Sequence, residues 1–291
     1  LLASSAASDV YKRQLPNDAT YGGNTDNEYT QKFGKQQGKY YVPQRAAAGL
    51  DPWATPQAYD NAKDFFDTGI TWSNSLNVAQ MLDKSSYSIS LGNTHQDGII
   101  SSTGMDRYNV KVSADTKLTN NWSSGFTANY ITTSIDKAVT SGNGLLRTVY
   151  AAPPSYDLAG IPSHVDGNPY TQNSFRGSFD NAYWAMENNK FTEDTNRFFG
   201  NVYASYQTDF GTTNHKLNAK YMVGVDAYTT HYVDSYGYGS NTGGGRGQIE
   251  NYGWTNATYN SLLTINYDWR INEDWGLNAV LGCLLYTSDA A

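Results

Sequence analysis

Side chains that could bind a metal ion or transfer protons are scattered along this sequence. The four histidines, His95, His164, His215 and His231, are far apart and lack the spacing typical of a zinc site. The run Asp166-Gly167-Asn168 lacks the further oxygen ligands that a calcium loop requires, and turn chemistry explains it better. We therefore expect no metal site, no cofactor and no catalytic residue, and the protein is not expected to be an enzyme.

Glycine and cysteine offer no further chemistry. The run from Gly243 to Gly247 has the composition of a phosphate-binding loop, but it follows no strand and opens no amphipathic helix. We expect it to be a flexible loop tip. The only cysteine, Cys283, cannot form a disulfide framework or a thiolate metal site by itself.

Aromatic residues in polar surroundings are the best candidates for binding. The chain has 24 tyrosines and 7 tryptophans, and many of them fall in two long stretches that we expect to be loops. Flat aromatic faces stack on sugar rings or grip a peptide with little loss of entropy. The candidate substrate-binding residues are Tyr228, Tyr232, Tyr236, Tyr238, Tyr252, Trp254 and Trp184. The alternative is that these rings pack the loops together or contact a protein partner.

Alternating strands must position these residues. Between Tyr108 and Leu118 every second residue is apolar or neutral and the intervening residues are polar, which is the period of a strand with two unlike faces. The same alternation predicts strands at about 71–81, 85–95, 106–118, 122–133, 198–206, 216–228, 259–269 and 275–281. One face would carry Val110, Val112, Phe126, Ala128, Tyr221, Val223 and Ile265. The other would carry Lys111, Asp115, Asn129, Lys220 and Asp226.

The connections between these strands alternate in length. Short turns are expected at about 82–84, 119–121, 209–215 and 270–274, and longer loops at about 96–105, 134–196 and 230–254. Up-and-down barrels of the outer membrane have short periplasmic turns and long extracellular loops. We therefore predict an all-β fold, a fragment of about eight strands of a transmembrane antiparallel up-and-down β-barrel. Ser240 should then be accessible outside the cell, and Thr119 should be periplasmic.

Two aromatic rows support the membrane assignment. Trp122, Tyr206, Tyr267, Trp269 and Trp275 lie near the short turns, and Trp72, Tyr108, Tyr130, Phe198 and Tyr259 lie near the long loops. The two interfaces of a membrane require such girdles, and eight residues from Trp122 to Tyr130 span roughly 26 Å, close to the ~25 Å apolar band. A soluble β-sandwich is the competing fold, but its strands are typically about 5–6 residues long. No apolar stretch is long enough for a transmembrane helix.

Both ends of the chain look foreign to the protein. Ser4–Gln14 reads as the translation of a transposon sequencing adapter, and Cys283–Ala291 reads as a frame of the reverse complement. The expected organisation is therefore an adapter-like artefact at 1–14, an extracellular loop region at 15–70, a partial barrel at 71–282 and a second artefact at 283–291. The net charge of −7 does not depend on these ends and provides no basic footprint for nucleic acid.

Several segments resemble one family of transporters. Asp64–Ile70 reads DFFDTGI, similar to the D-F-F-x-T-G segment of the SusC/RagA family of TonB-linked outer-membrane transporters. The resemblance continues through Tyr87–Leu91, Gln96–Ile100, Asp106–Asn109 and Asp194–Asn201, which occur in the family's order.

The resemblance covers about Asp64 to Gly282 and implies a function. A SusC-type protein imports a nutrient, a glycan or a peptide, through a large plugged barrel in the bacterial outer membrane. It does so with a SusD-like lipoprotein and with energy from TonB, which would act through a plug region that this sequence lacks. The open alternatives are a passive porin-type channel and a soluble carbohydrate-binding β-sandwich.

Overall fold

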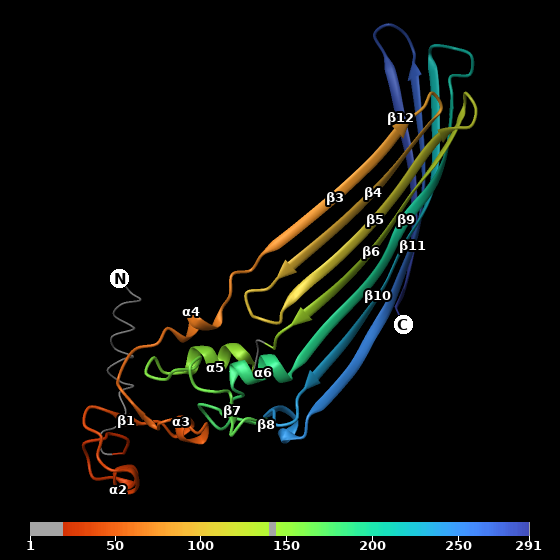
Figure 1. The fold of residues 1–291 in the computed structure, drawn as a ribbon. Coiled ribbons are helices and arrows are strands. Elements are labelled where there is room, and N and C mark those ends of the chain that lie inside the picture. Colours follow the sequence, from red (N-terminus) through yellow and green to blue (C-terminus); the bar gives the residue numbers. More distant parts are fainter. Residues whose placement is uncertain (1–19, 140–143, 291) are drawn as a thin grey trace.

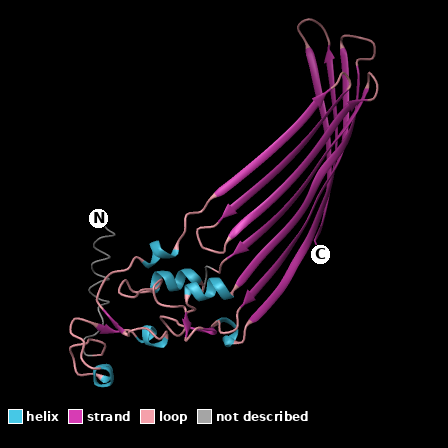
Figure 2. Ribbon diagram, in the orientation of Figure 1, coloured by secondary structure: helices cyan, strands magenta, loops and turns pink. Residues whose placement is uncertain are grey.

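The computed structural model describes residues 20–139 and 144–290 (Figure 1). They form one long, curved antiparallel sheet with a group of short helices and strands at one end, as the colouring by secondary structure makes clear (Figure 2). The adapter-like segment 1–14 lies outside the described residues. Among the described residues, no helix has the length and apolar character needed to span a bilayer.

The sheet contains eight strands in the order β12-β11-β10-β9-β6-β5-β4-β3, and each neighbouring pair is antiparallel. The strands are β3 (Thr71–Met81), β4 (Ser85–Asp97), β5 (Gly104–Lys117), β6 (Trp122–Lys137), β9 (Lys190–Thr208), β10 (His215–Tyr236), β11 (Gln248–Arg270) and β12 (Gly276–Ala290). Apart from β7 and β8, which form a small sheet of their own, strands that follow one another in the sequence are neighbours in the sheet, so the connectivity is up-and-down. The predicted all-β barrel-type sheet and its eight strands are confirmed.

The strand register divides the side chains into the two predicted faces. Val112 pairs with Ala128, and Phe126 pairs with Val202, which pairs with Val223, so these residues share one face. Lys111 pairs with Asn129 and Lys220 with Ser205, which places the polar residues on the opposite face. Many side chains of the apolar face are exposed, including Val223 at 41%. A contiguous exposed apolar surface of this kind is typical of a face that contacts a membrane or another protein.

Aromatic residues bound the apolar face at two levels. At the short-turn end Trp122 lies opposite Tyr206, with 5.0 Å between the ring centroids. At the other level Tyr130 lies opposite Phe198. Beyond that second level the same face becomes polar, because its next positions are His95, Asp106, Ser134, Asp194 and His231. The apolar band therefore occupies only part of each long strand.

The strands extend farther toward the long-loop end than the sequence predicts. The segment 230–254 was expected to be a loop, but β10 continues to Tyr236 and β11 begins at Gln248. Only 237–247 connects them, with the 3-10 helix η1 (Thr242–Gly245) at its tip. The prediction fails here because the extension lies beyond the apolar band, where neither face is hydrophobic and the period of two disappears.

The segment 134–196 is also more ordered than a long loop. It contains the end of β6, then α5 (Leu145–Ala151), β7 (His164–Val165), β8 (Asn168–Gln172) and α6 (Ala182–Asn188), and finally the start of β9. Asp166 and Gly167 connect β7 to β8 with φ values of 49° and 66°. Two consecutive positive φ values are typical of a tight hairpin turn, so turn chemistry is the correct interpretation of Asp166-Gly167-Asn168.

The N-terminal segment is folded onto these helices. It contains α2 (Glu28–Phe33), β1 (Tyr40–Tyr41), α3 (Pro43–Ala47), β2 (Trp53–Ala54) and α4 (Asn61–Phe65), whereas the sequence predicts a loop region at 15–70. The Tyr59 amide donates to the Pro154 carbonyl at 2.7 Å, and the Tyr40 hydroxyl donates to the Ser155 carbonyl at 2.5 Å. A hydrophobic cluster that includes Phe65 and Trp184 joins the two segments. We call this unit, made of 40–66 and 144–189, the end domain.

The strand β12 continues through 283–290, so the structure does not separate the adapter-like segment from the sheet. Its alternation is nevertheless broken there. Leu284 pairs with Leu262 and Tyr286 pairs with Asn260 on the polar face, and both side chains are exposed. The assignment of 283–291 as an artefact remains a prediction.

Candidate substrate-binding surface

Five of the seven predicted binding residues lie together on the polar face, near the end domain. Tyr232 pairs directly with Tyr252, and Thr230 pairs with Trp254. Tyr228 and Tyr236 precede and follow Tyr232 by four residues on β10, so both share its face. The sequence predicts Tyr228 at the end of a strand and the other four in a loop at 230–254, whereas the long strands β10 and β11 hold all five at fixed spacings.

Three of these rings form a stack that we call the aromatic platform: Tyr232, Tyr252 and Trp254. The centroids of Tyr232 and Tyr252 are 5.0 Å apart with an interplanar angle of 11°, and those of Tyr232 and Trp254 are 5.1 Å apart with an angle of 39°. Tyr252 is 44% exposed and Trp254 is 47% exposed. The platform therefore has a rigid position and an open aromatic surface, which suits stacking on a ligand.

Charged groups border the aromatic platform. Lys137 Nζ lies 4.5 Å from the centroid of the Tyr232 ring and 3.2 Å from Glu193 Oε2. On the other side, the Tyr252 hydroxyl donates to Asp234 Oδ2 at 3.1 Å. Lys137, Glu193 and Asp234 cannot be recognised from the sequence, because no apolar alternation marks this part of the strands.

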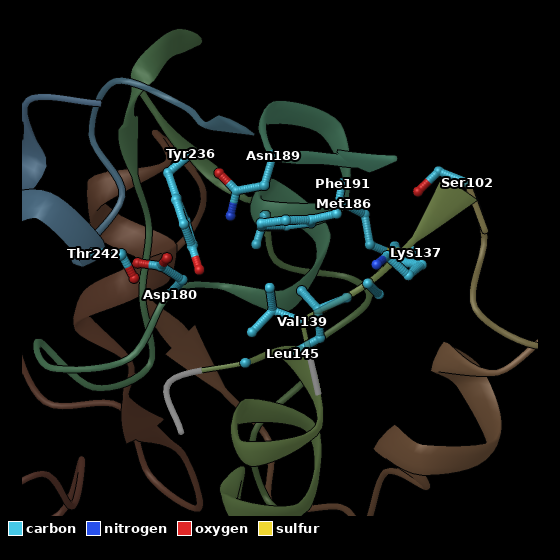
Figure 3. A pocket seen from close by; sticks show the side chains of 13 residues that line it. Ser102, Lys137, Val139, Leu145, Asp180, Met186, Asn189, Phe191, Tyr236 and Thr242 are labelled. Carbon is cyan, nitrogen blue, oxygen red and sulfur yellow. The ribbon is translucent and has the colours of Figure 1, made fainter. Parts of the chain in front are cut away.

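A cavity of about 210 Å³ lies between the strand ends and the end domain (Figure 3), and one of its lining residues, Lys137, contacts the Tyr232 ring of the platform. Lys137, Phe191 and Tyr236 line it from the strands, and Leu145 and Met186 line it from the helices. The remaining lining residues are Ser102, Ala138, Val139, Gly144, Asp180, Ala185, Asn189 and Thr242. Typical ligand pockets measure about 300–1,000 Å³, so this cavity has room for one small group of a larger ligand.

The buried carboxylate of Asp180 fixes the connection between β10 and β11. It accepts hydrogen bonds from Gln172 Nε2 at 2.7 Å, from Ser240 Oγ at 2.7 Å, and from both the backbone and the side-chain nitrogen of Asn241 at 2.8 Å. Ser240 is fully buried, so the predicted accessibility of this residue is wrong. Asp180 thus has a structural role, in which it holds 237–247 against the end domain.

Trp184 and Tyr238 differ from the other candidates. Trp184 is 0% exposed, packs in the hydrophobic cluster and donates from Nε1 to the Pro169 carbonyl at 2.7 Å. Trp184 is therefore a core residue, and the prediction that it binds substrate is wrong. Tyr238 is exposed and meets Tyr170 edge to face, with 5.8 Å between the centroids.

In the end domain, burial raises the pKa of the Tyr183 hydroxyl, which remains a neutral donor to the Asp64 carbonyl at 3.2 Å.

The histidines do not gather into a site. His95 is exposed and lies 2.8 Å from Asp106 and 3.3 Å from Asp97, on the face opposite the aromatic platform. Within the part of the chain that the structure describes, no group of three or more His, Cys, Asp or Glu residues is arranged to hold a metal ion.

Comparisons with known proteins identify the fold. No protein-family profile and no curated protein matches the sequence. Among solved structures, the RagAB peptide importer in its closed-closed state matches with a TM-score of 0.63 and 16% identity, over 80% of this chain and 27% of that chain. The same importer in its open-open state matches with a TM-score of 0.62 and 15% identity, over 97% of this chain and 30% of that chain.

These matches are to transporters rather than enzymes, and the chain spans less than a third of their length. At this level of identity the likeness concerns the fold. The resemblance to the SusC/RagA family that the sequence motifs indicate is therefore confirmed for the fold alone.

Proposed function

We propose that this chain forms part of the barrel wall of a SusC-type importer in the bacterial outer membrane. The observation that carries the proposal is the division of one sheet into two faces. One face has an apolar band between two aromatic levels, and the other is polar and carries the aromatic platform. A lipid phase on one side and an aqueous lumen on the other would account for both faces.

The proposed substrate is a glycan or a peptide that reaches the lumen from the long-loop end. The aromatic platform, with Tyr228, Tyr236 and Tyr238, would contact it. Two exposed rings held by strand pairing keep their geometry without the ligand, which lowers the entropy cost of binding.

The proposed partners are a SusD-like lipoprotein and TonB. The matching structures are named the RagAB peptide importer and the RagAB peptide transporter, and this name is compatible with a second protein component. We place that component at the long-loop end. TonB is proposed on the sequence resemblance alone, because transporters of the SusC type take their energy from TonB.

The test is uptake by cells that produce the complete transporter. Labelled peptide and oligosaccharide pools are supplied to cells with the wild type, with Tyr252→Ala/Trp254→Ala, and with Tyr221→Ala as a matched control on the apolar face. Loss of two stacking contacts should lower uptake at limiting substrate by about tenfold, and the control should keep at least half. Uptake that persists after the proton gradient is collapsed would favour a passive channel and contradict the proposal.

A further inference from the structure

Two carboxylates beside the aromatic platform form no ion pair with a cation of the described residues. Asp234 and Glu250 are directly opposite each other in the register of β10 and β11, and both lie on the face of the platform. Like charges at directly opposite positions destabilise a strand pair. Among the described residues, no Lys, Arg or His forms an ion pair with either one. Asp234 accepts from the Tyr252 hydroxyl, and Glu250 accepts from Gln248 Nε2.

Other acidic residues on the same face show the contrasting arrangement. Glu193 lies 3.2 Å from Lys137 Nζ, and Asp226 accepts two hydrogen bonds from Arg197, at 2.8 Å and 2.5 Å. The sheet thus neutralises these carboxylates with its own cations. The pair at Asp234 and Glu250 is left uncompensated next to exposed aromatic rings.

The aromatic platform already receives one cation from within the chain. Lys137 Nζ is 4.5 Å from the Tyr232 ring centroid, within the range of a cation–π interaction. Lys137 approaches from the side of β6 and β9, whereas Tyr252 and Trp254 belong to β11. Within the described part of the chain, no cation lies over either of those two rings.

We propose that Tyr252, Trp254, Asp234 and Glu250 form a subsite for a cationic group of the transported ligand. An ammonium or guanidinium group would lie against the exposed aromatic rings and offset the two carboxylates. This inference rests on the proposed import function and adds the charge of the substrate to it. A basic peptide side chain and an unacetylated amino sugar are the two sources of such a group.

The experiment measures ligand binding to the complete, detergent-purified transporter. Fluorescent pentapeptides with a central arginine or a central citrulline form one pair of ligands. Oligomers of glucosamine and of N-acetylglucosamine form the other pair. The cationic member of at least one pair should bind about tenfold more tightly, since a cation–π contact and a carboxylate contact together account for that ratio. The pair that shows the preference identifies the source of the cation.

Two variants locate the effect. Asp234→Asn/Glu250→Gln preserves side-chain shape and should reduce the preference to less than threefold while the affinity for the neutral ligand stays unchanged. Glu273→Gln/Asp274→Asn removes two charges at an exposed short turn at the far end of the sheet and should retain the full preference. The unchanged neutral affinity also shows that the variant is folded.

Failure of the cationic subsite can be distinguished from failure of the proposed import function. Equal affinities for charged and neutral ligands in the wild type, or an undiminished preference in Asp234→Asn/Glu250→Gln, overturns the cationic subsite and leaves the import function in place. Absence of binding by all four ligands, together with absence of uptake, overturns both.

Discussion

Substitution of Val223 by arginine should destabilise the complete barrel strongly, whereas the same substitution one residue earlier should not. Val223 lies on the apolar face, and Met222 lies on the polar face beside Tyr203. Ala219 is level with Tyr206 and Ala227 is level with Phe198, so Val223 is equidistant from the two aromatic levels. Four residues correspond to about 13 Å of strand, or about 10 Å along the membrane normal at a tilt of ~40°.

This depth determines the expected loss of free energy of unfolding. An arginine near the midplane of an outer-membrane barrel costs about 2–4 kcal/mol, and the cost falls toward zero at the interfaces. We expect Val223→Arg to lie in that range and Met222→Arg to cost less than about 1 kcal/mol, because its side chain would enter the aqueous lumen. The assay is reversible denaturant unfolding of the complete protein in lipid bilayers, with Val223→Leu as the control for a change of size.

Equal costs at the two positions would refute the facing assignment. A larger cost for Met222→Arg would show that the polar face, rather than the apolar one, contacts an apolar phase. Since the register links all eight strands, the first result would refute the assignment for the whole sheet, and the second would reverse it.

Three other variants probe the packing of the chain. Trp184→Ala should destabilise the end domain by about 3–5 kcal/mol, seen as faster hydrogen exchange in α6 with unchanged exchange in β5. Asp180→Ala leaves several donors without an acceptor and should speed proteolysis within 237–247 at least tenfold, whereas cleavage at an unchanged rate would deny its structural role. Gly200→Ala places Cβ 2.3 Å from the Thr127 carbonyl oxygen and should lower the free energy of unfolding by about 1–3 kcal/mol in the same unfolding assay. The control is Gly282→Ala, whose Cβ meets no atom within 4 Å and should leave the free energy of unfolding unchanged.

The alternation in sequence predicts the strands well wherever one face contacts an apolar phase. Between Tyr108 and Leu118, or between Leu217 and Ala227, each second side chain belongs to the apolar band. The predicted and observed bounds agree within a few residues for β5 and at the start of β10, whose end lies eight residues beyond the predicted one. At Tyr232 and Tyr252 both faces are polar or aromatic, so the pattern that reveals a strand is absent even though pairing continues.

Burial in the end domain could not be predicted for a different reason. Trp184 and Ser240 lie in stretches rich in Gly, Pro and Asn, whose composition indicates loops. Their burial depends on long-range contacts, such as the bond from Ser240 Oγ to Asp180 and the cluster that joins Phe65 to Trp184. Local sequence carries no signal for contacts between segments so far apart.

The central claim is that the sheet crosses the outer membrane with its long-loop end outside the cell. Whole cells with single cysteines in the complete transporter, treated with an impermeant maleimide, test it most directly. The outer labelling position is Arg246, because Ser240 is buried. The periplasmic labelling position is Asn120, because the hydroxyl of Thr119 accepts hydrogen bonds from the Asn121 and Trp122 amides in the turn. Arg246→Cys should label in intact cells, and Asn120→Cys should label only after the outer membrane is permeabilised. Labelling of Asn120→Cys alone in intact cells would contradict the orientation and, with it, the proposed route of the substrate.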